Sequence, residues 1–456
     1  MNKPRLKRVR RGRHNPDFTG LLKETLTAET IAIGSELLLG GRLDTNSLYI
    51  AEALGTLGIE VRYKSVVGDD RASIRRMVRA AAGRVGLVVL TGGLGPTLDD
   101  CTREAVADVT REALEDNRTA HRQVVGWLRS RHRKAGDVQL RQALIPRGAT
   151  VLRNPAGSAP GFLMVHGSSI IVALPGVPIE AQEMFEHSVL PRLRRARKGC
   201  APLIRRTLLT YGLPESEVEQ QVMDLVPQGY GITLGTLASP LGVALSLTAV
   251  YDHVGQRRRR QSVTSNGDTP QDVVQRSLGA MRSRLGALVY GEGRETMEEV
   301  VGRSLAAKRL TLATAESCTG GLIGHRLTQV PGSSGYYDGG VVCYSNEAKV
   351  RWLGVDPDVI RIHGAVSAEV AAAMAEGIKR QSGSAIGVSV TGIAGPGGGT
   401  STKPVGLVFV GLALHDGSTS TRRFQFHGTR DAVKLRASQA ALNCVRLALV
   451  GTRDVT

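Results

Sequence analysis

The chain has few aromatic residues and no long apolar run. Aromatic residues make up 4% of the sequence, although 41% of it is hydrophobic, and no stretch of eighteen uncharged apolar residues occurs. No membrane span is therefore expected. The first twenty residues hold seven lysines and arginines against one acid, but no apolar segment follows them, so a secretory signal is not expected either.

Cysteines are also few, and none of them stand in a pair. The five cysteines are scattered and form no CxxC motif. This pattern is typical of a protein in the reducing cytoplasm, and it argues against a disulfide framework or a zinc site.

The formal net charge of +18 raises the question of nucleic-acid binding. Short basic clusters occur at 129–134, 192–198 and 257–260, but no aromatic residues alternate with them in a base-reading motif. We therefore interpret the clusters as solvated faces and rank nucleic acid as an unlikely partner. Attraction of anionic phosphate substrates is a lesser alternative.

A chain of 456 residues is too long for one ordinary core, so two or three domains are expected. From residue 29 onward, apolar strands alternate with turns and helices. The strands are expected at 30–34, 60–67, 86–91 and 169–174, and the helices at 46–57, 71–82, 100–110 and 119–135. This alternation predicts a doubly wound α/β domain over 25–195, after a mobile basic tail over 1–24.

The pattern changes between residues 196 and 290. Strands are expected at 206–211 and 242–251, and helices at 215–225 and 270–285. Between them, 253–269 is polar and basic, which predicts a flexible insertion. We expect a small α+β linker domain here, without chemistry of its own.

A third domain is predicted over 291–456. Helices are expected at 295–307, 319–330, from 346, at 368–381 and at 431–450, and strands at 310–315, 340–344, 386–391, 405–414 and 419–426. Two adjacent late strands after an alternating start favour a three-layer α/β domain with some antiparallel pairing.

Ser317 lies in AESCTGG, where a strand is expected to turn into a helix. Ligands of open α/β sheets bind at the carboxyl ends of strands, and glycines at 320 and 321 allow a close approach to the backbone. The N–H groups of the helix start are expected to bind an anion or an oxyanion. Ser317 or Thr319 would equally suit a plain helix cap.

Lys349 lies in YSNEAK, one turn into a second helix that is expected to start at the same edge. Partial burial near the positive end of a helix should lower its pKa. A neutral lysine can accept the proton of a serine hydroxyl. Taken alone, an exposed lysine would be the simpler interpretation.

A glycine-rich segment, TGIAGPGGG at 391–399, follows an apolar strand. Such a loop can form an anion nest from successive N–H groups, with Thr391, Gly392, Gly395, Gly397 and Gly398 as candidate binding residues. Arg430, at the start of the last helix, can pair with a phosphate or a carboxylate.

The motifs AESCTGG, YSNEAK, TGIAGPGGG, KPVG and G-x-R-D, over about 293–450, resemble the C-terminal domain of the CinA family. The resemblance implies hydrolysis of nicotinamide mononucleotide to nicotinate mononucleotide and ammonia, without a metal or other cofactor. It implies Ser317 as nucleophile, Lys349 as base and Tyr344 as an assisting residue. It places Thr391, the 395–399 loop and Arg430 in the nucleotide site, and it implies a homodimer. Cys318 is the alternative nucleophile.

A second candidate site follows the apolar strand at 86–91, in TGGLGPTLDD. Gly92, Gly93 and Gly95 permit close approach of a phosphorylated ligand. Asp99 and Asp100 can hold a hard cation, and the carboxylates of Asp44 and Glu180 can join them. Asp99 and Asp100 would equally suit the cap of the next helix.

The motifs GSELLLG, DTNS, GGLGPTLDD, NPAGSAPG and LPGVPIE, over about 27–190, resemble the molybdopterin-binding-like domain of CinA proteins. In some family members this domain is an ADP-ribose pyrophosphatase that needs a divalent metal such as Mg, Mn or Co. The resemblance adds Asn46 and Thr97 to the substrate-binding residues. A non-catalytic pterin- or nucleotide-binding module and an accessory role in competence or DNA damage are the alternatives.

Overall fold

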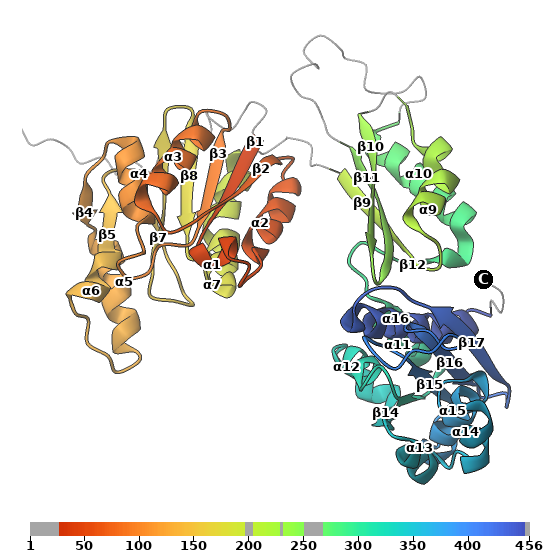
Figure 1. Ribbon diagram of the computed structural model, residues 1–456. Coiled ribbons are helices and arrows are strands. Elements are labelled where there is room, and N and C mark those ends of the chain that lie inside the picture. Colours follow the sequence, from red (N-terminus) through yellow and green to blue (C-terminus); the bar gives the residue numbers. More distant parts are fainter. Residues whose placement is uncertain (1–26, 197–203, 229–230, 250–267, 452–456) are drawn as a thin grey trace, which may run out of the picture. The chain divides into compact units, whose positions relative to one another are not determined.

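The computed structural model describes residues 27–196, 204–228, 231–249 and 268–451 (Figure 1). The predicted tail over 1–24 lies outside these residues, and so does most of the predicted insertion over 253–269. The chain divides into two compact units, 1–204 with 249–269 and 205–248 with 270–456. In the parts that the structure describes, no helix is long and apolar enough to cross a membrane.

The first unit contains a six-stranded sheet with the order β2-β1-β3-β8-β7-β6. Strands β1 (Thr27–Ile33), β2 (Glu60–Val67), β3 (Leu87–Thr91) and β8 (Ser169–Leu174) are parallel, as the sequence predicts. Strands β7 (Gly161–His166) and β6 (Thr150–Leu152) add an antiparallel edge that the sequence pattern did not predict.

Helices cover both faces of this sheet, which confirms the doubly wound arrangement. Leu87 and Val89 of β3 pack in one cluster with α2 (Thr45–Gly55) and α7 (Pro178–Met184). Val88 and Leu90 pack on the opposite face with α3 (Arg71–Ala82) and α4 (Thr102–Thr110). The remaining α-helices and β-strands of this unit are α1 (Ser35–Leu38), β4 (Leu114–Asp116), α5 (Arg118–Arg129), α6 (Asp137–Leu140), β5 (Leu144–Pro146) and α8 (Leu190–Ala196).

The second unit begins with a four-stranded sheet of order β10-β11-β9-β12 and two helices. Its elements are β9 (Ile204–Thr210), α9 (Glu215–Val222), β10 (Ile232–Ser239), β11 (Gly242–Ala249), α10 (Pro270–Leu285) and β12 (Val289–Glu292). Strands β10 and β12 were not predicted. β10 has a central glycine and a mostly exposed surface, and β12 has only four residues, so neither has a strong apolar pattern.

The rest of the second unit is a three-layer α/β domain, as predicted. Its sheet has the order β14-β13-β15-β16-β17. Strands β14 (Tyr337–Val342), β13 (Leu312–Glu316) and β15 (Ile386–Gly392) are parallel. Strand β16 (Leu407–Ala413) is antiparallel to both of its neighbours, β15 and β17 (Thr419–Gln425). Helices α11 (Met297–Lys308), α12 (Leu322–Thr328) and α16 (Arg430–Leu449) cover one face, and α13 (Asn346–Leu353), α14 (Pro357–His363) and α15 (Ala368–Ser382) cover the other.

The register of the three parallel strands determines where the chain leaves the sheet. Glu316, the last residue of β13, is paired with Val342 of β14 and Val390 of β15. The segments after all three strands therefore emerge at one edge, which brings Ser317 to the same edge as Thr391 and the start of α13.

Candidate active site

Ser317 and Lys349 meet at the carboxyl edge of the C-terminal sheet. The Lys349 Nζ donates a hydrogen bond to the Ser317 Oγ over 3.2 Å. Ser317 is 8% exposed and Lys349 is 1% exposed, although lysine is rarely buried in proteins. Burial of this amine against a serine hydroxyl rules out the simpler interpretation of Lys349 as an exposed helix cation.

The remaining contacts of Lys349 are all with neutral backbone oxygens. Its Nζ also donates to the carbonyl oxygens of Cys343 at 3.0 Å and of Tyr344 and Ser345 at 3.4 Å. In the described part of the chain, no carboxylate forms an ion pair with it. Burial therefore lowers the pKa of Lys349 below its ordinary value of 10.5, because the charged form loses water without gaining a counter-ion.

Tyr344 and Arg430 form a separate polar cluster near this pair. The Arg430 guanidinium donates to the Tyr344 hydroxyl and to the carbonyl of Gly395, both over 2.7 Å. Tyr344 is 60% exposed, so its ring faces solvent rather than the buried Ser317. Its backbone carbonyl, not its hydroxyl, contacts Lys349.

The predicted anion site at the start of the helix after Ser317 is corrected by the structure. Helix α12 begins at Leu322, three residues later than expected, and neither Ser317 nor Thr319 caps it. The buried carboxylate of Glu316 instead accepts the N–H groups of Gly321, Ile323 and Gly324 over 2.8–3.0 Å. These donors are not free for an anion, because a protein carboxylate already uses them.

Glu316 was not among the predicted site residues. Its position at the end of a fully buried strand, next to the candidate nucleophile, was the available signal in the sequence. The carboxylate holds the turn after Ser317 against the start of α12 and forms no hydrogen bond with the Ser317 side chain.

The other predicted binding residues differ in hydrogen bonding and, for the glycines, in exposure. The Thr319 Oγ1 is buried and has no hydrogen-bond partner among the described residues, whereas the Thr391 Oγ1 donates to the carbonyl of Ala365 over 2.7 Å. Gly320 and Gly321 have positive φ angles of 63° and 94°, which accounts for the glycines in this turn. Gly392 and Gly395 lie near the sheet, whereas Gly397 and Gly398 are exposed in the loop that follows.

Cys318 is poorly suited to be the nucleophile. Burial raises the pKa of its thiol to about 12, so the thiol stays protonated at neutral pH. A thiol is a far weaker nucleophile than a thiolate. The environment therefore favours Ser317 over its neighbour.

All of the predicted residues of the N-terminal site except Thr97 line one cavity of about 470 Å³. This cavity contains Asn46, the loop of Gly92, Gly93 and Gly95, and the four predicted acids Asp44, Asp99, Asp100 and Glu180. Thr97 is not part of the lining; its N–H and hydroxyl donate to the Asp100 carboxylate. The Asn46 Oδ1 is buried without a partner among the described residues.

The four acids do not form a ready metal site. The Asp44 carboxylate caps α2 at the N–H of Ser47 over 3.0 Å, and the Glu180 carboxylate accepts from Asn154 over 2.7 Å. Asp100 binds Thr97, and neither Asp99 nor Asp100 caps α4, whose N-cap is Cys101. Among the described residues, no group of three acidic, histidine or cysteine side chains is arranged to hold a metal ion.

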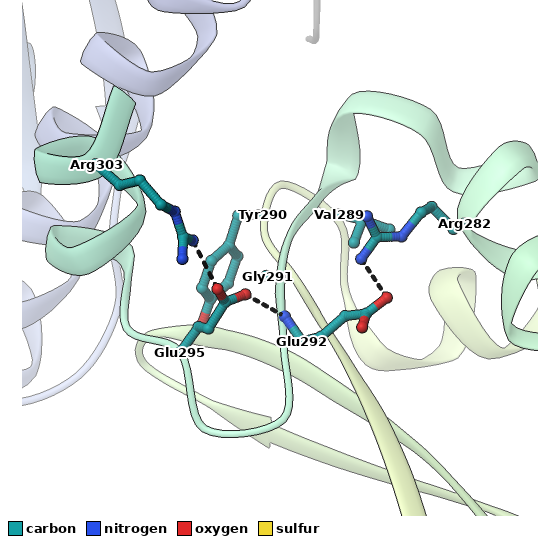
Figure 2. Close-up of a pocket in the computed structure, with 7 residues that line it drawn as sticks. All are labelled: Arg282, Val289, Tyr290, Gly291, Glu292, Glu295 and Arg303. Atoms are coloured by element: carbon teal, nitrogen blue, oxygen red, sulfur yellow. Dashed lines mark hydrogen bonds and ion pairs between the residues drawn. The ribbon is translucent and has the colours of Figure 1, made fainter. Parts of the chain in front are cut away.

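A further cavity, of about 590 Å³, lies where α10, β12 and α11 meet (Figure 2). Its charged side chains neutralise one another: Arg282 pairs with Glu292, and Arg303 pairs with Glu295 over 2.6 Å. The lining contains no serine, cysteine, lysine or histidine, and both of its carboxylates are paired with arginines.

Three family patterns match the chain in succession. A probable molybdopterin binding domain matches residues 29–195, the damage-inducible protein CinA KH domain matches 205–291, and the CinA C-terminal domain matches 294–449. The small domain that was predicted only as α+β is thus similar to the KH domain of these proteins.

Relatives extend the match over almost the whole chain. Putative competence-damage inducible proteins of Moorella thermoacetica and Halothermothrix orenii are 42% and 40% identical, over 417 and 416 residues; each alignment covers 91% of this chain and 97% of the relative. The solved structure of the competence/damage inducible protein CihA from Agrobacterium tumefaciens is 39% identical over 34% of this chain and 95% of its own, with a TM-score of 0.32. The identity to the two relatives over almost their whole length shows that the chain belongs to the competence-damage inducible protein (CinA) family.

Proposed function

We propose that the C-terminal domain is a serine amidohydrolase and that its substrate is nicotinamide mononucleotide. The observation that carries the proposal is the buried Lys349 amine, 3.2 Å from the Ser317 hydroxyl and without a carboxylate partner in the described residues. A lysine in this environment favours the neutral form, which has a lone pair to accept the serine proton.

The reaction follows from this pair in two stages. The neutral Lys349 amine takes the Ser317 Oγ proton while the Oγ attacks the amide carbon, and the same proton then goes to the departing nitrogen as ammonia leaves. Water next attacks the resulting ester, gives its proton to Lys349, and releases the carboxylic acid as the Ser317 Oγ recovers a proton. No metal takes part in these steps.

The surroundings of the pair favour an anionic nucleotide as substrate. Arg430 is exposed and held by Gly395 and Tyr344, so its guanidinium is fixed in orientation before a ligand arrives. Such a guanidinium suits a phosphate group. The unpartnered, buried Thr319 hydroxyl near the nucleophile is a candidate donor to the carbonyl oxygen that becomes negative during attack.

Product analysis tests this proposal. The full chain should convert nicotinamide mononucleotide to equal amounts of nicotinate mononucleotide and ammonia, and nicotinamide riboside, which lacks the phosphate, should be a poorer substrate. Arg430→Ala should raise the KM for the mononucleotide more than that for the riboside. Turnover of neither compound would contradict the proposal.

For the cavity of the first unit we propose binding of a small phosphorylated nucleotide, with ADP-ribose as the candidate ligand. It brings a glycine loop together with Asn46, whose unpartnered amide oxygen can accept a hydrogen bond from a hydroxyl of the ligand. The acids among the described residues provide no preformed metal site. Binding of a small phosphorylated nucleotide is therefore the function that the cavity supports directly.

Chromatography of ADP-ribose reactions tests whether cleavage accompanies binding. Appearance of AMP and ribose 5-phosphate in the presence of Mg²⁺, Mn²⁺ or Co²⁺, and its loss with EDTA, would establish the predicted pyrophosphatase. Tight binding of ADP-ribose without cleavage under all three metals would leave a binding module.

A further inference from the structure

The loop that follows β3 has its carbonyl groups fixed on the protein side. The Thr102 Oγ1 donates to the carbonyl of Gly92 over 2.9 Å, and the Thr102 N–H donates to the carbonyl of Gly93 over 3.2 Å. Gly93 has a φ of 65°, and a Cβ there would lie 2.2 Å from the Thr102 Oγ1. The loop is therefore drawn tightly onto the start of α4.

Arg103 holds the next two carbonyl groups. Its guanidinium donates to the carbonyl of Leu94 over 2.6 Å and to that of Gly95 over 2.9 Å. The Arg103 side chain is fully buried. It therefore lies beneath the loop rather than in the cavity, whose lining does not include it.

The fixed carbonyls determine where the N–H groups of the loop point. A trans peptide is planar, with its N–H opposite its C=O, and these peptides are trans. The carbonyls of Gly92, Gly93 and Leu94 face the protein, so the N–H groups of the residues after them, 93–95, face the opposite side. No described residue accepts a hydrogen bond from these three N–H groups, and all three residues line the cavity.

The charge of Arg103 has no direct counter-ion. Its neighbour Glu104 pairs with Arg141 over 3.3 Å, and no described carboxylate forms an ion pair with Arg103. An arginine stays protonated even when buried. The cavity itself is lined by six acids and the single cation Arg42: the acids are Glu36, Asp44, Asp69, Asp99, Asp100 and Glu180. Acids outnumber cations in this lining, and the positive charge of Arg103 behind the loop offsets part of their repulsion of a phosphate at the loop.

We propose that Arg103 is the positioning residue of this cavity: it aims the N–H groups of the glycine loop at the ligand, and its buried charge attracts the phosphate that they bind. The inference rests on the proposed nucleotide binding by the first unit. Arg103 touches no ligand, because the loop separates it from the cavity. The ligand class is a phosphate ester or diphosphate.

Titration calorimetry on the full chain tests the role, with inorganic pyrophosphate and ADP-ribose as probes. The variants are Arg103→Met, which removes the charge, and Arg103→Lys, which keeps it without the two-pronged contact. Arg79→Met, at an exposed arginine on α3, is the matched control. We expect Arg103→Met to lower the affinity for both probes by about tenfold or more, and Arg103→Lys to lower it less. The control should bind both probes with wild-type affinity.

The outcomes separate the charge of Arg103 from its structural role. If both variants lost the same affinity for the probes and kept the wild-type melting temperature, the electrostatic role would be overturned. If Arg103→Met kept the wild-type affinity, the whole inference would be overturned, while nucleotide binding itself would stand. If Arg103→Met does not melt cooperatively, Arg103→Lys decides: weaker binding supports the role and wild-type binding contradicts it. Failure of the wild type to bind either probe would remove the proposed nucleotide binding as well.

Discussion

At the scale of single residues, the state of Lys349 controls the proposed reaction. Its pKa is lowered by burial, so the folded protein releases this proton at a lower pH than an exposed lysine does. Only the neutral amine accepts the serine proton. We expect kcat/KM for nicotinamide mononucleotide to fall as the pH drops through the lowered pKa and to level off above it. A rate that stays constant or rises toward acidic pH would exclude Lys349 as the base.

Cys318 provides a second test at this scale. Because burial raises the pKa of its thiol to about 12, the thiolate is scarce at neutral pH. Cys318→Ala should therefore keep most of the amidase activity, and iodoacetamide should inactivate the wild type slowly. Steady-state rates of the variant check this. Loss of activity in folded Cys318→Ala would return the thiol to consideration as the nucleophile.

At the scale of elements, Glu316 connects β13, the turn after Ser317 and α12. Glu316→Gln leaves one oxygen for three N–H donors and turns an amide N–H₂ toward them. We expect a loss of about 2 kcal/mol in unfolding free energy and a fall in kcat larger than the change in KM. Urea unfolding and steady-state kinetics measure both. Glu347→Gln, at an exposed acid in the first turn of α13, is the control.

Two results would limit this interpretation of Glu316. If Glu316→Gln lowered stability but left kcat at the wild-type value, the carboxylate would hold the helix start alone and would not position the nucleophile. If Glu347→Gln lowered kcat to the same extent, the effect would come from the loss of a negative charge near the site rather than from the three hydrogen bonds.

The sequence predicted those elements whose apolar pattern matches the burial of their residues in the structure. The apolar run of β3 indicated a central strand, and all five of its residues are buried. The start of α12 was placed too early, because the pattern does not reveal that the acid before Ser317 folds back onto the N–H groups after it. For the same reason, the N–H groups at the start of α12 were predicted to be free for an anion, whereas the Glu316 carboxylate accepts their hydrogen bonds.

In the candidate sites, the sequence predicted the position of some residues and missed others. Neighbouring parallel strands bring Ser317 and Lys349 to one edge, and this follows from topology. The fully buried Arg103 was missed, because a charged residue in a helix of mixed composition is normally exposed. Its contacts with the carbonyls of Leu94 and Gly95 become visible only once the backbone path of the glycine loop is known.

At the scale of the whole molecule, the small KH-like domain and the C-terminal domain form one unit. Arg446 of α16 is 4% exposed and donates to the carbonyls of Ala287 at 2.6 Å and Val289 at 3.3 Å, and Gln439 donates to the carbonyl of Leu241 over 2.7 Å. The sequence pattern predicted a small α+β linker domain over 196–290, and a KH-domain pattern matches 205–291. The sequence pattern did not predict these contacts with α16, because hydrogen bonds from side chains to distant backbone carbonyls leave no local signal in the sequence.

This junction makes a prediction about stability. Arg446→Met removes two hydrogen bonds to the half-buried carbonyls of Ala287 and Val289, so we expect the second unit to lose about 2–3 kcal/mol in unfolding free energy. Calorimetry of the full chain should show a lower melting temperature for one transition and an unchanged one for the first unit. A uniform shift of both transitions would contradict the division into two units.

The central claim is the Ser317–Lys349 amidohydrolase, and the most direct test is ammonia release from nicotinamide mononucleotide. The assay compares the wild type, Ser317→Ala, Lys349→Ala and the exposed control Arg351→Ala, each with and without EDTA. We predict activity that resists EDTA, is lost in the first two variants and survives in the control. Full activity in either Ser317→Ala or Lys349→Ala, or none in the wild type, would contradict the account.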